Sequence, residues 1–93
     1  MSEPIRIQKS FVISNRLGLH ARPAAMLVEA VSNLHCEVLI SKDELTVDAK
    51  SLMGVLTLAA EHGSTLDICA QGDDAQRAID LLGEMISNKF GED

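Results

Sequence analysis

Aromatic side chains are nearly absent from this sequence, which has no tryptophan, no tyrosine and two phenylalanines among its 93 residues. Aliphatic side chains must therefore fill the core, and the aromatic platform on which single-stranded nucleic acids usually stack is missing. Basic residues are also scarce, since 8 lysines and arginines against 14 aspartates and glutamates give a formal net charge of −6. This charge would repel a polyanion, so both shortages argue against a nucleic-acid partner.

Cysteines are few and far apart. Cys36 and Cys69 form no Cys-x-x-Cys pair, and each lies in a predicted strand. We therefore expect reduced and largely buried thiols rather than a disulfide or a metal site. His35 and His62 show no ligand spacing with each other or with the cysteines, and we expect neither a metal nor a cofactor.

Long apolar runs are missing as well. No stretch approaches the roughly 20 residues that span a bilayer, and the first residues lack the basic segment and apolar run of a signal peptide. We therefore expect a cytoplasmic protein without membrane insertion. A chain with 46% hydrophobic and 24% charged residues has an ordinary globular composition. Its length predicts a single domain over residues 1–93, with the core at about 5–88.

Apolar and polar residues alternate in four segments, a period that is typical of half-buried strands. These segments are residues 5–14, 36–41, 45–49 and 66–70. The second and third are separated by a short polar turn, which predicts a hairpin.

Two helices are expected between these strands. The first, at about 21–33, carries an apolar stripe formed by Ala24, Leu27, Val28, Val31 and Leu34. The second begins after Ser51, a good N-cap, and should end with His62 in its last turn and Gly63 as its C′ residue.

A third helix should start near Asp73, because Gln76 follows three residues later in an Asp version of the capping box. The acidic tail after Phe90 is expected to fray. The resulting order, β-α-β-β-α-β-α, predicts an α+β fold in which a four-stranded antiparallel sheet carries its helices on one face.

The junction between the first strand and the first helix is the best candidate for chemistry. Pro23 suits the first helical turn, so His20 should lie at the helix mouth, where free N–H groups and the helix dipole attract anions. Arg22 adds a cation whose donors suit phosphate oxygens. The dipole also disfavours an imidazolium, and a neutral imidazole is a nucleophile. The pattern indicates a histidine that accepts a phosphoryl group.

Residues 18–24 (GLHARPA) resemble the active-site signature of the HPr family, the histidine phosphocarriers of the bacterial phosphoenolpyruvate-dependent phosphotransferase system (PTS). Residues 50–56 (KSLMGVL) resemble the regulatory serine of that family and the helix after it. The similarity covers nearly the whole chain. It implies an HPr-like open-faced β-sandwich, in agreement with the pattern of elements.

The resemblance assigns roles to the residues of the first motif. His20 would take a phosphoryl group on Nδ1 from enzyme I and pass it to enzyme II A-type domains. Arg22 would steady the phosphate oxygens, and the backbone of Ala21 and Arg22 would support them. Such a protein is a component of a relay and not a stand-alone enzyme for a small molecule, needs no cofactor, and is expected to be a monomer.

Ser51 has two roles that do not exclude each other. As an N-cap it stabilises its helix by about 1 kcal/mol. By resemblance it is also the target of an HPr kinase/phosphorylase, and its phosphate would hinder docking more than it would damage the fold. Leu52, Met53 and Leu56 would form an apolar docking patch beside His20, although core packing is an alternative for Leu56 and also for Leu52.

The sequence does not decide between partners of the sugar branch and of the nitrogen branch of the PTS. Leu17 stands where many sugar-branch members have a small polar residue and where the nitrogen-branch relative NPr has leucine. Glu29, Ser32 and Gly54 replace lysines that some members display, although the match over 50–56 favours the HPr type. An NPr-like carrier is one alternative. Others are a regulatory protein that binds a transcriptional regulator or an enzyme under control of Ser51, and a small ferredoxin-like ligand-binding module.

Overall fold

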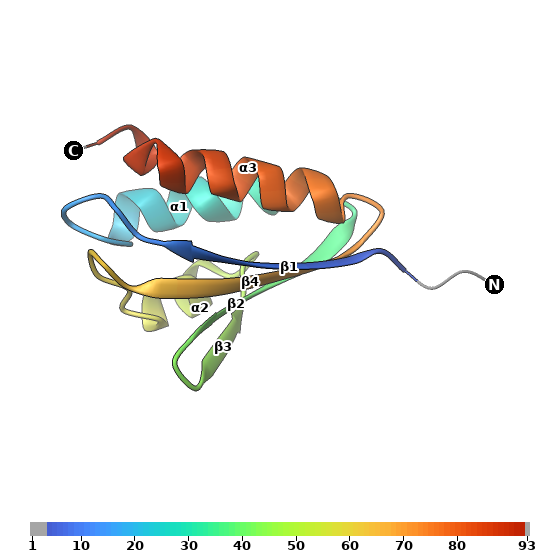
Figure 1. Ribbon diagram of the computed structural model, residues 1–93, viewed down its shortest axis with the longest axis horizontal. Coiled ribbons are helices and arrows are strands. Elements are labelled where there is room, and N and C mark those ends of the chain that lie inside the picture. Colours follow the sequence, from blue (N-terminus) through green and yellow to red (C-terminus); the bar gives the residue numbers. More distant parts are fainter. Residues whose placement is uncertain (1–3, 93) are drawn as a thin grey trace.

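The computed structural model describes residues 4–92, and the elements follow the predicted order (Figure 1). The strands are β1 (Arg6–Val12), β2 (Cys36–Lys42), β3 (Leu45–Asp48) and β4 (Thr65–Gly72). The helices are α1 (Ala21–Val31), α2 (Leu52–Thr57) and α3 (Ala75–Ser87), and a short 3-10 turn, η1 (Lys89–Gly91), follows α3.

The four strands form one antiparallel sheet in the order β1-β4-β2-β3. Strand β4 therefore lies between the first strand and the hairpin, and its Ala70 is opposite both Ile7 of β1 and Val38 of β2. Because the register keeps the alternate apolar residues on the same face, one side of the sheet is apolar and the other polar. The predicted α+β open-faced sandwich is confirmed.

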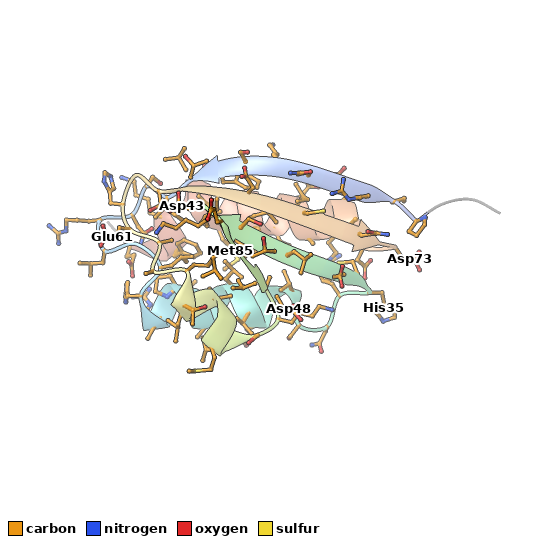
Figure 2. All side chains as sticks on the ribbon, turned by 90° about the horizontal axis from the view of Figure 1, so that it is seen from below. His35, Asp43, Asp48, Glu61, Asp73 and Met85 are labelled. Carbon is orange, nitrogen blue, oxygen red and sulfur yellow. The ribbon has the colours of Figure 1, made fainter. Side chains whose placement is uncertain are left out.

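The helices cover the apolar face of the sheet. Figure 1 shows α1 and α3 side by side above β1 and β4, and α2 contacts α1 and β3 at the other edge. The core between these layers is aliphatic apart from Phe90, as the composition predicts. Figure 2 shows the opposite face of the sheet, with His35 and Asp73 at the end of the molecule away from Glu61.

Two sequence-based details of the strands need adjustment. The predicted first strand is too long at both ends, because Ile5 precedes β1 and is exposed, and Ile13 follows β1 and is fully buried. The thiols of Cys36 and Cys69 are free but only half-buried. Burial is nevertheless the main cause that raises the pKa of Cys36.

Helix α2 ends at Thr57, so the prediction that His62 and Gly63 close it is wrong. The chain leaves the helix at Ala59, which has a φ of 49°. The Lys42 ammonium donates to the Leu58 carbonyl oxygen at 3.2 Å and so caps the end of the helix. The early end leaves the carbonyl of Ala60 free to bind another part of the chain.

Helix α3 begins at Ala75, and the predicted capping box is also wrong. Asp74 is the N-cap residue, but its carboxylate accepts from the backbone N–H of His35 at 2.7 Å and not from its own helix. The Gln76 amide instead donates to Asp80 at 2.9 Å. Asp74 therefore joins the start of α3 to His35, the residue before β2.

Candidate functional site

The loop between β1 and α1 is held against the segment that follows α2. The backbone N–H of Leu19 donates to the Ala60 carbonyl oxygen at 2.8 Å. Gly18 has a φ of 68°, and a Cβ on it would overlap the Ala60 carbonyl oxygen and lie 2.8 Å from Glu61 Cα. Both conditions require glycine at this position. The early end of α2 thus fixes the residues immediately before His20.

His20 is the N-cap residue of α1, in the position predicted for it. Its backbone is extended and its carbonyl oxygen accepts from the Ala24 N–H at 3.0 Å. Its side chain makes no capping bond to the described part of the helix and is 37% exposed. The imidazole therefore points away from the helix, and the first-turn N–H groups are left without a cap from this side chain.

The imidazole is instead bound by the C-terminal tail. Nε2 of His20 lies 2.9 Å from Oε1 and 3.1 Å from Oε2 of Glu92. The Asn15 side-chain amide donates to the same Oε1 at 2.8 Å. Arg22 Nη1 lies 3.8 Å from Oε2. The carboxylate of Glu92, from the same chain, thus lies beside the side chains of His20 and Arg22 at the start of α1.

The tail reaches this position because the chain reverses after α3, so the expected fraying is wrong for the described residues 91–92. Lys89, Phe90 and Gly91 all have positive φ values, between 54° and 76°. Phe90 is 1% exposed and anchors the reversal in the core. The Glu92 N–H then donates to the Lys89 carbonyl oxygen at 3.0 Å. Burial of the aromatic ring offsets the unfavourable left-handed backbone.

Asn15 connects the tail to the loop before α1. Its side chain is fully buried, and its amide nitrogen donates both to the Gly18 carbonyl oxygen at 2.7 Å and to Glu92. Two acceptors on one side fix the orientation of this amide, and its Oδ1 finds no partner among the described residues. The hydrogen bond from His20, followed by that from Asn15, lowers the pKa of Glu92 below its usual value.

Arg22 and Ala21 lie in the exposed first turn of α1. The Arg22 side chain is 61% exposed, so its guanidinium is accessible to a ligand from solvent. The structure therefore brings His20 and Arg22 together around Glu92.

Ser51 caps α2, as predicted, because its hydroxyl accepts from the Gly54 N–H at 3.1 Å. The next two residues, Leu52 and Met53, are 42% and 72% exposed, so Leu52 does not belong to the core. Leu56 is partly buried and packs against the core. Leu17, in the loop before His20, is 66% exposed. It is a further exposed apolar residue, and the sequence had not predicted its exposure.

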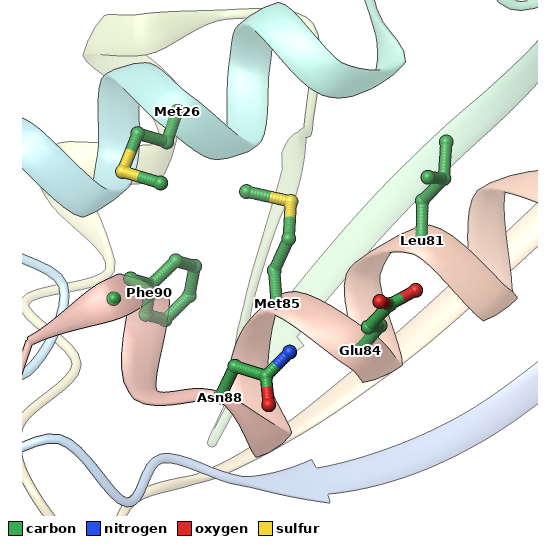
Figure 3. A pocket seen from close by; sticks show the side chains of 7 residues that line it. Met26, Leu81, Glu84, Met85, Asn88 and Phe90 are labelled. Carbon is green, nitrogen blue, oxygen red and sulfur yellow. The ribbon is translucent and has the colours of Figure 1, made fainter.

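A shallow apolar pocket of about 410 Å³ lies between α1 and α3 (Figure 3). Met26 of α1 and Met85 of α3 face each other across it, and Phe90 forms its end. It contains none of the predicted site residues. No group of three potential metal ligands occurs within residues 4–92. The described helices include none long and apolar enough to cross a membrane.

Two residues of this site, Asn15 and Glu92, were missed by sequence reasoning. The separation of Glu92 from His20 is 72 residues, so no local spacing could have paired them. A signal was present, however, since a phenylalanine near the end of an aromatic-poor chain indicates an anchored tail.

Comparisons with known proteins agree with the geometry. A family model described as "PTS HPr component phosphorylation site" matches residues 7–88. The phosphocarrier protein HPr of Cupriavidus necator is 45% identical over 86 residues, which cover 92% of this chain and 97% of that protein.

Solved structures show the same similarity. The crystal structure of HPr from Thermoanaerobacter tengcongensis superposes with a TM-score of 0.90 at 39% identity, covering 94% of this chain and 98% of that one. The solution structure of Crh, the catabolite repression HPr of Bacillus subtilis, gives a TM-score of 0.64 at 35% identity and covers 86% and 95% of the two chains.

Proposed function

The chain belongs to the HPr family of PTS phosphocarriers, and from this premise we propose that His20 accepts a phosphoryl group from enzyme I and passes it to enzyme II A-type domains. The observation that carries the proposal is the place of His20 at the mouth of α1, with its side chain turned away from the helix. A nucleophilic ring is thereby combined with free donors that suit a phosphoryl group.

The transfer itself requires positioning and charge neutralisation more than covalent chemistry from the protein. Nδ1 of His20 attacks the phosphorus atom, and the bond from phosphorus to the donor histidine breaks. Arg22 offers its exposed guanidinium to the phosphoryl oxygens, while the backbone N–H groups of Ala21 and Arg22 lie at the positive end of α1. The reverse sequence delivers the group to the next protein.

Partners dock on the apolar surface beside this site. Leu17, Leu52 and Met53 are large, exposed and apolar, and α2 contacts α1. Methionine suits a surface that must fit several partners in turn. Leu56 supports this surface from the core side, since it packs against buried residues.

Ser51 is the proposed regulatory position, modified by an HPr kinase/phosphorylase. Its hydroxyl is half-buried in the cap, and a phosphate there would add roughly −1.5 to −2 charge beside Leu52 and Met53. Docking of enzyme I would be weakened, whereas a complex with a transcriptional regulator would become possible. The free thiols of Cys36 and Cys69 are consistent with the cytoplasm as the place of this exchange.

The test is incubation of the purified chain with enzyme I and phosphoenolpyruvate, followed by intact mass before and after mild acid. One acid-labile phosphate is expected, and His20→Ala should abolish it. Ser51→Ala is the matched control and should be phosphorylated like the unaltered chain. Enzymes I of the sugar branch and of the nitrogen branch are compared, since Leu17 leaves an NPr-like carrier open.

A chain that takes no phosphate from either enzyme I would contradict the carrier function. The regulatory alternative would then gain support, because the chain resembles Crh as well as HPr and retains the capping serine.

A further inference from the structure

The contact between His20 and the tail goes beyond what the signature motif requires. We propose that Glu92 is a positioning residue for phosphoryl transfer, which keeps the proton of His20 on Nε2, leaves Nδ1 as the nucleophile, and stabilises the charge that the ring gains. This inference rests on the proposed carrier function of His20.

The hydrogen-bonding geometry fixes which ring nitrogen carries the proton. Both carboxylate oxygens of Glu92 lie near Nε2, at 2.9 and 3.1 Å. An ionised carboxylate only accepts hydrogen bonds, so Nε2 must be the donor. A neutral imidazole has one N–H, and its other nitrogen, Nδ1, therefore holds the free lone pair. Glu92 thus selects the nucleophilic atom.

The same contact assists the chemical step. When Nδ1 bonds to phosphorus, the electron pair of the donor P–N bond returns to the donor histidine. The proton on Nε2 stays in place, so the His20 ring acquires positive charge. A carboxylate that already accepts from Nε2 stabilises this charge without further reorganisation, as the acid of a catalytic triad does for its histidine.

Glu92 is built into the site rather than resting on the surface. Its side chain is 16% exposed, and the fully buried Asn15 holds its Oε1 at 2.8 Å. Asn15 is in turn tied to the Gly18 carbonyl oxygen at 2.7 Å, and Phe90 anchors the tail in the core. These contacts hold the carboxylate independently of His20.

The position of the carboxylate favours assistance over inhibition. It occupies Nε2, on the opposite side of the ring from the lone pair that attacks. Its link to Arg22, at 3.8 Å, is long, so the exposed guanidinium can turn to an arriving phosphoryl group while Glu92 remains on the ring.

The experiment combines nitrogen-15 NMR of the His20 ring, which needs no partner protein, with the rate of phosphorylation by enzyme I under single-turnover conditions. The unaltered chain should show the Nε2–H tautomer. Glu92→Ala should raise the share of the Nδ1–H tautomer several-fold and slow transfer about ten-fold, the effect of one charge-assisted hydrogen bond. Its affinity for enzyme I should not change.

Two further variants separate the parts of the proposal. Glu92→Gln keeps an acceptor oxygen without the charge, so it should retain the Nε2–H tautomer and lose only part of the rate. Glu84→Gln removes the same charge from an exposed position on α3 and should match the unaltered chain in both measurements.

Normal tautomer and normal rate in Glu92→Ala would overturn the role of Glu92 while the carrier function stands. Faster transfer in Glu92→Ala would also overturn it, because the carboxylate would then be a competitor of the phosphoryl group. An unaltered chain that is never phosphorylated would overturn the carrier function, and with it the contribution of Glu92 to transfer.

Discussion

The N-termini of α1 and α2 are built in opposite ways. At α2, the side chain of Ser51 turns back and accepts from the Gly54 N–H three residues later. At α1, the side chain of His20 turns away from its helix and meets Glu92, 72 residues later. Local sequence completes the N-terminus of α2, and tertiary structure completes that of α1. The N-terminus of α1, which has no side-chain cap of its own, is the one at which we propose that a phosphoryl group is accepted.

Replacing the glycine near the N-terminus of each helix, Gly18 for α1 and Gly54 for α2, should give the largest difference in stability. In Gly18→Ala the new Cβ meets the backbone of Ala60 and Glu61 at a φ of 68°, where neither side can yield. We expect a loss of about 2–4 kcal/mol in the free energy of unfolding and slower phosphorylation, because the loop before His20 must move. Urea denaturation and the enzyme I assay measure the two effects.

Gly54→Ala is the matched change at the N-terminus of α2. Its Cβ would lie 3.3 Å from Ser51 Oγ and from Val47 Cβ, and the gain in helix propensity of up to about 1 kcal/mol offsets this tight contact. Stability should therefore change by less than about 1 kcal/mol. Equal losses of stability in Gly18→Ala and Gly54→Ala would contradict the view that only the N-terminus of α1 depends on distant backbone.

Substitutions of Ser51 should have a smaller effect and separate its two roles. Ser51→Ala removes the cap and should cost about 1 kcal/mol in the free energy of unfolding, with phosphorylation of His20 unchanged. Ser51→Asp keeps a good cap, so its stability should match the unaltered chain. Its added charge beside Met53 should nevertheless slow transfer from enzyme I. Unimpaired transfer in Ser51→Asp would argue against control of docking by charge.

The same contrast explains what the sequence could reveal. The Ser51 cap and the strand alternation were predictable because they depend on residues a few positions apart. The end of α2 was not, since it depends on Lys42 and on the pairing of Leu19 with Ala60. Likewise, the motif located His20 and Arg22, whereas Asn15 and Glu92 join the site only through the chain reversal at Phe90.

Lowering the pH should have the mildest effect, and it should act on the N-terminus of α1 and not on that of α2. The pKa of Glu92 is lowered, chiefly by the hydrogen bond from His20 and then by that from Asn15, with Arg22 also nearby. Ionised Glu92 therefore stabilises the docked tail above the ordinary glutamate range, and this stabilisation is lost as the pH falls through the lowered pKa. The Ser51 hydroxyl does not ionise in this range, so the cap of α2 should persist.

Carbon-13 NMR of the Glu92 carboxyl group measures this difference directly, with the Gly54 amide signal as the internal control for α2. In His20→Ala the largest cause of the shift is gone, so the pKa of Glu92 should rise toward its ordinary value while the Gly54 signal stays in place. If Glu92 titrates at the same pH in both chains, His20 does not hold the tail. The tail beside the N-terminus of α1 would then be held by Asn15 and Phe90 alone. His20 would be as independent of distant contacts as Ser51 is at the N-terminus of α2.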